Sequence, residues 1–123
     1  VYWPSSYDNG LRIIDISDRL NPVEVGFWNP TSMDLYDIEL RNDHVFLADE
    51  YPFPGRAVVV DVSDPALPVE VDSYPGRAQT SSLALGNDGL LLFTDSNGGF
   101  RLFSECVTVI FKDGFESGDT SAW

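Results

Sequence analysis

The sequence predicts an all-β fold assembled from repeated units. A block of residues near its start recurs further along the chain without a gap, and short apolar runs alternate with Gly, Pro, Asn and Asp. No stretch shows the 3.6-residue apolar period of an amphipathic helix. With 123 residues, of which 43% are hydrophobic, the chain is long and apolar enough to bury a core.

The repeat is the strongest signal. Residues 10–28 align with residues 56–74 at an offset of 46 residues, and most of the apolar positions that differ exchange Ile for Val. The identical positions, numbered in the first copy, are Asp15, Ser17, Asp18, Pro22, Val23, Glu24 and Val25. So long an ungapped match indicates a duplicated structural unit.

The second half of the unit also recurs. Residues 40–49 resemble residues 85–95, because in each segment an Asn-Asp pair lies between two apolar runs, as in a β-hairpin. A third unit begins at residues 99–103, which echo residues 10–14. It then departs from the pattern, since Ser104 stands where an Asp is expected.

Each full unit is predicted to contain four short strands. In the first unit we expect them at Leu11–Ser17, Val23–Trp28, Tyr36–Leu40 and Val45–Asp49. In the second we expect them at Ala57–Ser63, Val69–Tyr74, Ser82–Leu85 and Leu90–Thr94. Four strands in a unit of about 40–50 residues is the pattern of a β-propeller blade. We therefore predict a partial β-propeller over residues 1–110, with about two four-stranded antiparallel blades plus an incomplete third, and a tail at residues 111–123.

Two segments carry a resemblance to a known family. Residues 11–15 and 57–61 resemble the pentapeptide that names the LVIVD repeat, and the Ser-Asp and Pro-Val-Glu-Val stretches after them extend the resemblance over residues 10–103. Arg19 departs from it, because Pro65 stands at the equivalent position. The resemblance implies a β-propeller on an exported bacterial or archaeal protein, often surface-associated, with no established catalytic residues.

The tail also resembles exported sequences. Residues 111–123 are similar to a C-terminal segment that recurs on exported bacterial proteins, and to the opening of some jelly-roll carbohydrate-binding modules. Both resemblances favour a secreted, periplasmic or cell-surface location. The alternative is a polar extension whose aromatic rings pack on the last sheet.

The number of blades predicts an incomplete assembly. Two and a fraction blades cannot close a ring, because propellers typically need about 4–8. We expect a C-terminal piece of a longer propeller, or a chain that associates with another copy through open blade edges. The terminal blade should leave apolar side chains only partly covered, such as Leu91, Phe93, Phe100 and Leu102.

Charge restricts the partners. Acidic residues outnumber basic ones by 20 to 7, for a net charge of −13, so the surface repels nucleic acid. No apolar run approaches the ~20 residues that span a bilayer, so we expect no membrane insertion. Cys106 is the single cysteine, which rules out a disulfide within the chain and favours a buried thiol.

The acidic residues offer weak metal candidates. Asp15, Asp18, Asp61 and Asp64 follow strands, where carboxylates could bind Ca²⁺, but a repeated Asp beside Ser more often accepts hydrogen bonds from the turn backbone. Residues 95–99 resemble the opening of a calcium loop but lack its later ligands, which favours a Gly-rich hairpin turn. We predict no metal and no cofactor.

Catalytic residues are scarce. His44 is the only histidine and lies in a predicted turn, and no Ser-His-Asp or Cys-His set can be assembled around it. The chain is therefore predicted not to be an enzyme. The alternatives are a propeller hydrolase or lyase whose catalytic residues lie in missing blades, and a structural spacer that presents the tail.

The segment 51–55 is the candidate binding loop. It is longer than the other turns, is expected to join two blades, and holds Tyr51 and Phe53, each followed by a proline. Such rings could bind a sugar or a peptide, or else cover the core between blades. The sequence thus predicts an extracytoplasmic, non-catalytic binding or adhesion scaffold for an unknown protein or carbohydrate ligand.

Overall fold

A computed structural model describes residues 1–5, 10–30, 33–51, 53–76, 78–96 and 99–104. The expectations for Cys106 and for the tail at 111–123 fall outside these residues, and so does the middle of the turn at 95–99. The described part of the chain has no helix long and apolar enough to cross a membrane.

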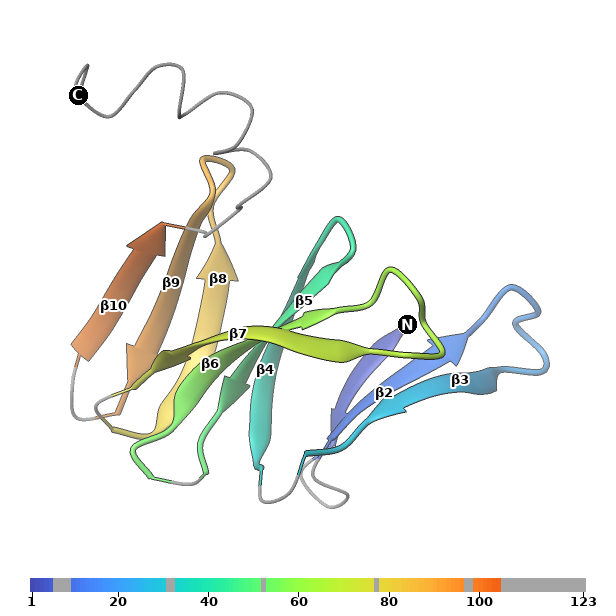
Figure 1. Ribbon diagram of the computed structural model, residues 1–123, viewed down its shortest axis with the longest axis horizontal. Coiled ribbons are helices and arrows are strands. Elements are labelled where there is room, and N and C mark those ends of the chain that lie inside the picture. The colour runs from blue at the N-terminus through green and yellow to red at the C-terminus, as the bar shows by residue number, and fades with distance from the viewer. Residues whose placement is uncertain (6–9, 31–32, 52, 77, 97–98, 105–123) are drawn as a thin grey trace.

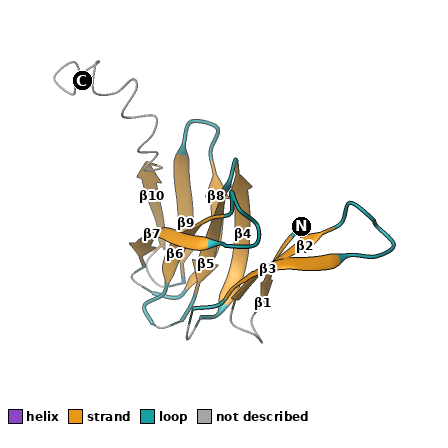
Figure 2. Ribbon diagram, turned by 45° about the vertical axis from the view of Figure 1, so that its right-hand side comes forward, coloured by secondary structure: helices purple, strands orange, loops and turns teal. Residues whose placement is uncertain are grey.

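Within the described residues, ten strands form three antiparallel sheets, with the central sheet between the other two (Figure 1). The first sheet contains β1 (Tyr2–Ser5), β2 (Gly10–Asp15) and β3 (Val23–Trp28), in that order. The central sheet contains β4 (Leu35–Arg41), β5 (His44–Asp49), β6 (Arg56–Asp61) and β7 (Val69–Pro75), also in order. The last sheet contains β8 (Thr80–Leu85), β9 (Leu90–Asp95) and β10 (Gly99–Ser104), with β9 in the middle. Figure 2 shows that the described elements are strands joined by loops and turns.

The fold class is confirmed as an all-β partial propeller, and all eight predicted strands end within two residues of the observed ones. The grouping of strands differs from the expectation of two four-stranded units. The first repeat contributes β2 and β3 to the first sheet but β4 and β5 to the central sheet. The reason is that the connection from β3 to β4 crosses to the next sheet, whereas β5 turns back to pair with β6. One full four-stranded sheet thus lies between two three-stranded ones.

The duplication is visible in fine detail. The pairing of β2 with β3 shifts register between Ile13 and Ile14, and the pairing of β6 with β7 shifts between Val59 and Val60. These positions are 46 residues apart, so the same β-bulge recurs in both repeats.

The aspartates that end β2 and β6 repeat their contacts as well. The backbone N–H of Ser17 donates to Asp15 over 2.8 Å, and that of Ser63 donates to Asp61 over 2.8 Å. These bonds are the main reason that the pKa of each aspartate lies below its ordinary value. The predicted local hydrogen bonds are therefore confirmed. Within the described residues, no three His, Cys, Asp or Glu side chains gather in a way that could hold a metal ion.

The core consists of two clusters, one on each face of the central sheet. Val45 and Leu47 of β5 pack with Leu11 and other residues of the first sheet, while Phe46 packs with Phe93 of the last sheet. Neighbouring side chains on a strand point to opposite faces, so a strand covered on both faces needs an uninterrupted apolar run. This requirement explains the apolar stretch at residues 57–60, whose side chains are all buried.

One packing expectation was wrong in part. Leu91 and Phe93, which were expected to be partly covered, are fully buried because their face of β9 packs on the central sheet. Phe100 and Leu102 are exposed, as expected.

The shared core yields a stability prediction. Replacing the buried Phe46 with Ala should lower the free energy of unfolding by ~3–5 kcal/mol or abolish cooperative unfolding, because it opens a cavity between two sheets. Replacing Phe53, which is 70% exposed, with Ala should change it by less than about 0.5 kcal/mol. Urea unfolding monitored by tryptophan fluorescence measures both. Equal effects of the two substitutions would contradict the assigned core.

Candidate functional site

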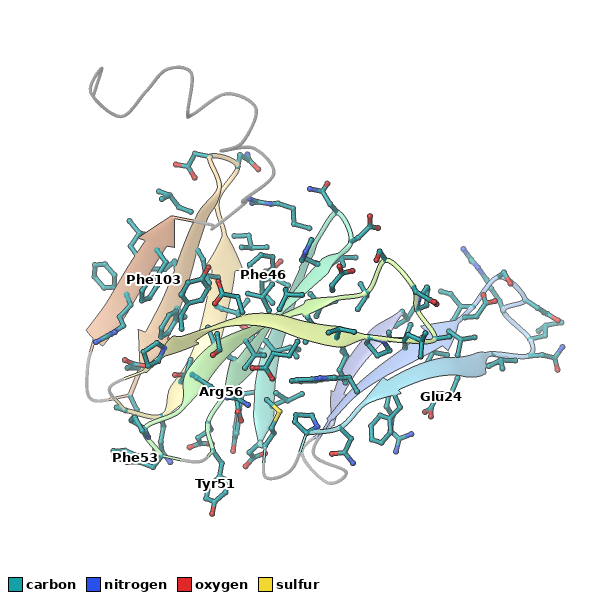
Figure 3. The ribbon with its side chains drawn as sticks, viewed as in Figure 1. Glu24, Phe46, Tyr51, Phe53, Arg56 and Phe103 are labelled. Atoms are coloured by element: carbon teal, nitrogen blue, oxygen red, sulfur yellow. The ribbon has the colours of Figure 1, made fainter. Side chains whose placement is uncertain are left out.

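The candidate loop, residues 51–55, lies in the connection from β5 to β6 at one end of the central sheet. It was expected to join two blades; it joins neighbouring strands of one sheet, because the sheets are offset from the repeats. Tyr51 is 56% exposed and Phe53 is 70% exposed. Figure 3 shows both rings pointing away from the sheet, so neither covers the core.

The loop backbone is fixed at its far end. Gly55 has a φ of +81°, and a Cβ there would lie 2.8 Å from the carbonyl oxygen of Asp49 and 2.9 Å from the backbone nitrogen of Thr80. Only glycine fits this close approach without strain. The N–H of Gly76 donates to the carbonyl of Gly55 over 3.0 Å, which ties the loop to the connection after β7. The Phe53–Pro54 peptide bond is cis.

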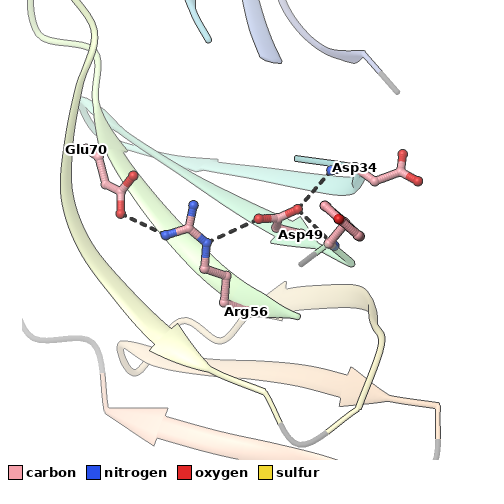
Figure 4. Close-up of polar contacts among 5 residues, drawn as sticks. Asp34, Asp49, Arg56 and Glu70 are labelled. Carbon is pink, nitrogen blue, oxygen red and sulfur yellow. Dashed lines mark hydrogen bonds and ion pairs between the residues drawn. The ribbon is translucent and has the colours of Figure 1, made fainter. Parts of the chain in front are cut away.

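A buried carboxylate fixes the near end of the loop. Asp49, the last residue of β5, is fully buried, and its Oδ1 accepts hydrogen bonds from the N–H groups of Asp34 (2.9 Å) and Tyr51 (3.2 Å). Its Oδ2 accepts one from Arg56 Nε at 3.2 Å, and Arg56 Nη1 also reaches Glu70 at 3.2 Å (Figure 4). The position of Tyr51 therefore depends directly on Asp49 and, through it, on Arg56.

Burial and hydrogen bonding act on Asp49 in opposite directions. Loss of hydration raises the pKa of its carboxyl above the ordinary value, and this effect outweighs the two N–H donors and the Arg56 charge that lower it. Arg56 offsets part of the cost of burying the charge, because a charge-assisted hydrogen bond replaces part of the lost hydration.

The last sheet repeats this arrangement. Asp95, the last residue of β9, is buried and accepts a hydrogen bond from Thr80 Oγ1 at 3.1 Å, with Arg101 Nε 3.7 Å from its Oδ2. Asp49 and Asp95 are 46 residues apart. The sequence predicted Asp49 only as a strand end and Asp95 as the first residue of the turn at 95–99, although an acid that closes an apolar run at the repeat offset was a usable signal.

Two further acids and a tyrosine lie next to the loop. Tyr36 of β4 is 55% exposed and donates its hydroxyl to Glu50, a bond that raises the pKa of Tyr36 together with the charges of Asp34 and Glu50. We call Asp34, Tyr36, Glu50, Tyr51 and Phe53 the aromatic-acidic surface.

The chemistry of this surface suits binding. Exposed aromatic rings pack on the apolar faces of sugars or on side chains, and carboxylates accept hydrogen bonds from hydroxyl groups. His44 lies at the opposite end of β5 and does not contribute.

The buried and the turn aspartates should affect stability with opposite pH dependence. The raised pKa of Asp49 means that its contribution to stability is fully present below pH ~3.8 and is lost as the pH rises through the folded pKa. The lowered pKa of Asp61 means that its contribution is present above pH ~3.8 and is lost as the pH falls.

Unfolding free energies of the wild type, Asp49→Asn and Asp61→Asn between pH 3 and pH 7 measure this difference. The unfolding free energy of the wild type minus that of Asp49→Asn should fall as the pH rises. The same difference for Asp61→Asn should increase. Two slopes of the same sign would refute the assigned environments.

Comparison with known proteins agrees with the repeats described above. A scan against models of protein families matched the LVIVD repeat over residues 6–30 and 34–75, which is more than half of the chain. Searches of curated proteins and of solved structures found no significant match. The strand pairs β2–β3 and β6–β7, with their repeated bulge and the turn in which Asp accepts from Ser, lie within the matched segments. The chain belongs to the LVIVD repeat family.

Proposed function

We propose that this protein is a non-catalytic binding scaffold that acts outside the cytoplasm and takes its ligand on the aromatic-acidic surface. The observation that carries the proposal is a set of three aromatic side chains, each more than half exposed, beside a buried and hydrogen-bonded carboxylate. Exposure of apolar rings to water is unfavourable, so a ligand that covers them gains free energy from removing their surface from water.

The support for binding is the fixed backbone beneath the rings. Asp49 holds the N–H of Tyr51, and Gly55 is held by Gly76, so little conformational freedom of the loop backbone is lost when a ligand binds. Rigid scaffolds commonly present binding residues on such loops.

A carbohydrate fits this surface best. Tyr51 and Phe53 offer flat apolar faces for a sugar ring, and Glu50 and Asp34 offer acceptors for its hydroxyl groups. A net charge of −13 argues against polyanionic ligands. The location outside the cytoplasm rests on the resemblance of residues 10–103 and 111–123 to exported proteins. A protein ligand is the second candidate, because exposed tyrosines are enriched at protein interfaces.

The binding prediction is tested with a glycan array, followed by calorimetry on the sugars that bind. Tyr51→Ala and Phe53→Ala should each weaken binding at least tenfold, which is about 1.4 kcal/mol. The matched control is Leu67→Ala. Leu67 is 69% exposed, an exposed fraction close to that of Phe53. It lies in the turn after β6, at the opposite end of that strand from the loop, so its replacement should leave the affinity unchanged.

Two outcomes would count against this reading. Equal affinities for Phe53→Ala and Leu67→Ala would remove the loop from the binding site. Hydrolysis or elimination of a bound polysaccharide by the chain would favour the alternative of a catalytic propeller, because a scaffold releases its ligand unchanged.

A further inference from the structure

The last sheet has an outer face that no other sheet covers in the described part of the chain. Leu83, Leu91 and Phe93 point toward the central sheet, so the residues that alternate with them point outward. The register of β8, β9 and β10 places the outward residues side by side. We define the outer face as Ala84, Leu90, Leu92, Thr94, Phe100 and Leu102.

The outer face carries no charge, and five of its six residues are apolar. Phe100 is 71% exposed and Leu102 is 56% exposed. All of its residues are uncharged, in a chain with 20 acidic and 7 basic residues. Contiguous apolar surface of this kind on a soluble protein usually marks an interaction site.

The repeat shows what kind of contact this face is built for. Leu92 lies 46 residues after Phe46, and it pairs with Leu102 as Phe46 pairs with Val59. In the central sheet that face is covered by the last sheet, which leaves Phe46 only 2% exposed and Val59 only 5%. The outer face therefore continues an interface that is already present within the chain, and its expected occupant is another apolar sheet face.

We propose that the outer face binds the outer face of a second copy of the chain in a two-fold symmetric dimer. The free face of the first sheet is a poorer partner, because it carries the Arg12–Glu24 ion pair, with the Arg12 guanidinium 4.5 Å from the centre of the Phe27 ring. Covering that ion pair with an apolar sheet would remove its remaining hydration without new hydrogen bonds. Two uncharged outer faces meet without this cost, and symmetric pairing through one patch is the commonest form of homodimer.

The net charge adds a second expectation. Two chains of charge −13 repel each other at long range, and added salt screens this repulsion while leaving the apolar contact intact. The dimer should therefore strengthen with salt, whereas association through ion pairs would weaken.

Sedimentation velocity on the full 123-residue chain tests the proposal. It is measured across protein concentration at 0.15 M NaCl, where the Debye length is ~8 Å, and at 0.5 M NaCl, where it is shorter. We expect a monomer–dimer equilibrium with a lower Kd at high salt. Leu102→Lys should raise the Kd at least tenfold, since it introduces two charges into each dimer. Phe100→Ala, a milder change at a 71% exposed side chain, should raise it several-fold and guards against a folding defect in the lysine variant.

Phe27→Gln is the control, because Phe27 lies on the free face of the first sheet and should not affect the Kd. A monomer at every concentration and salt would overturn the proposal. A loss of association in Phe27→Gln as large as that in Leu102→Lys would also overturn it, in favour of head-to-tail stacking of the last sheet on the first.

Discussion

The fold depends on the coverage of both faces of the central sheet. In β5 and β6 nearly every side chain is buried, because one face packs on the first sheet and the other on the last sheet. In the part of the chain that the structure describes, each buried cluster includes residues of the central sheet, so neither neighbouring sheet has a cluster of its own. Removing the first sheet would expose Val45, Leu47, Val58 and Val60, and removing the last sheet would expose Phe46 and Val59. Each large side chain left in water forfeits ~1.5–3 kcal/mol. The stability of each sheet is therefore tied to the others.

The offset between repeats and sheets strengthens this dependence. Each repeat supplies two strands to one sheet and two to the next, so the ladder hydrogen bonds of the central sheet join successive repeats. Polar contacts add to the connection between β4 and β8, where Asp37 Oδ2 accepts hydrogen bonds from Ser82 Oγ at 2.9 Å and from the N–H of Leu83 at 3.0 Å. The candidate loop benefits from this construction, because Asp49 accepts a hydrogen bond from Asp34 in the connection before β4, and Gly55 accepts one from Gly76 in the connection after β7.

Local patterns explain why the strands were predictable and the sheets were not. The short apolar runs, the Asn-Asp turns and the Asp-Ser turns are patterns of a few consecutive residues. The strands and the hydrogen bonds of Asp15 and Asp61 could therefore be predicted. Which strands pair across a connection is a tertiary choice, and nothing local marks β3 to β4 as a crossing between sheets. The same limit applies to the candidate loop. Tyr51 and Phe53 were singled out from the neighbouring prolines and the length of the segment, but the roles of Asp49 and Arg56 depend on Asp34, just before β4, and on Glu70 of β7.

Native-state hydrogen exchange tests the central claim most directly. If the sheets share their cores as described, the amides of β5 and β6 should exchange last and should open together with those of β4 and β7. Amides at the edges of the first and last sheets should exchange earlier, because among the described residues no sheet covers the outer face of either one. The opposite result would be exchange in blocks that follow the sequence repeat, with residues 11–49 opening as one unit and residues 57–95 as another. Such blocks would show that each repeat is stable by itself and that the central sheet does not hold the fold together.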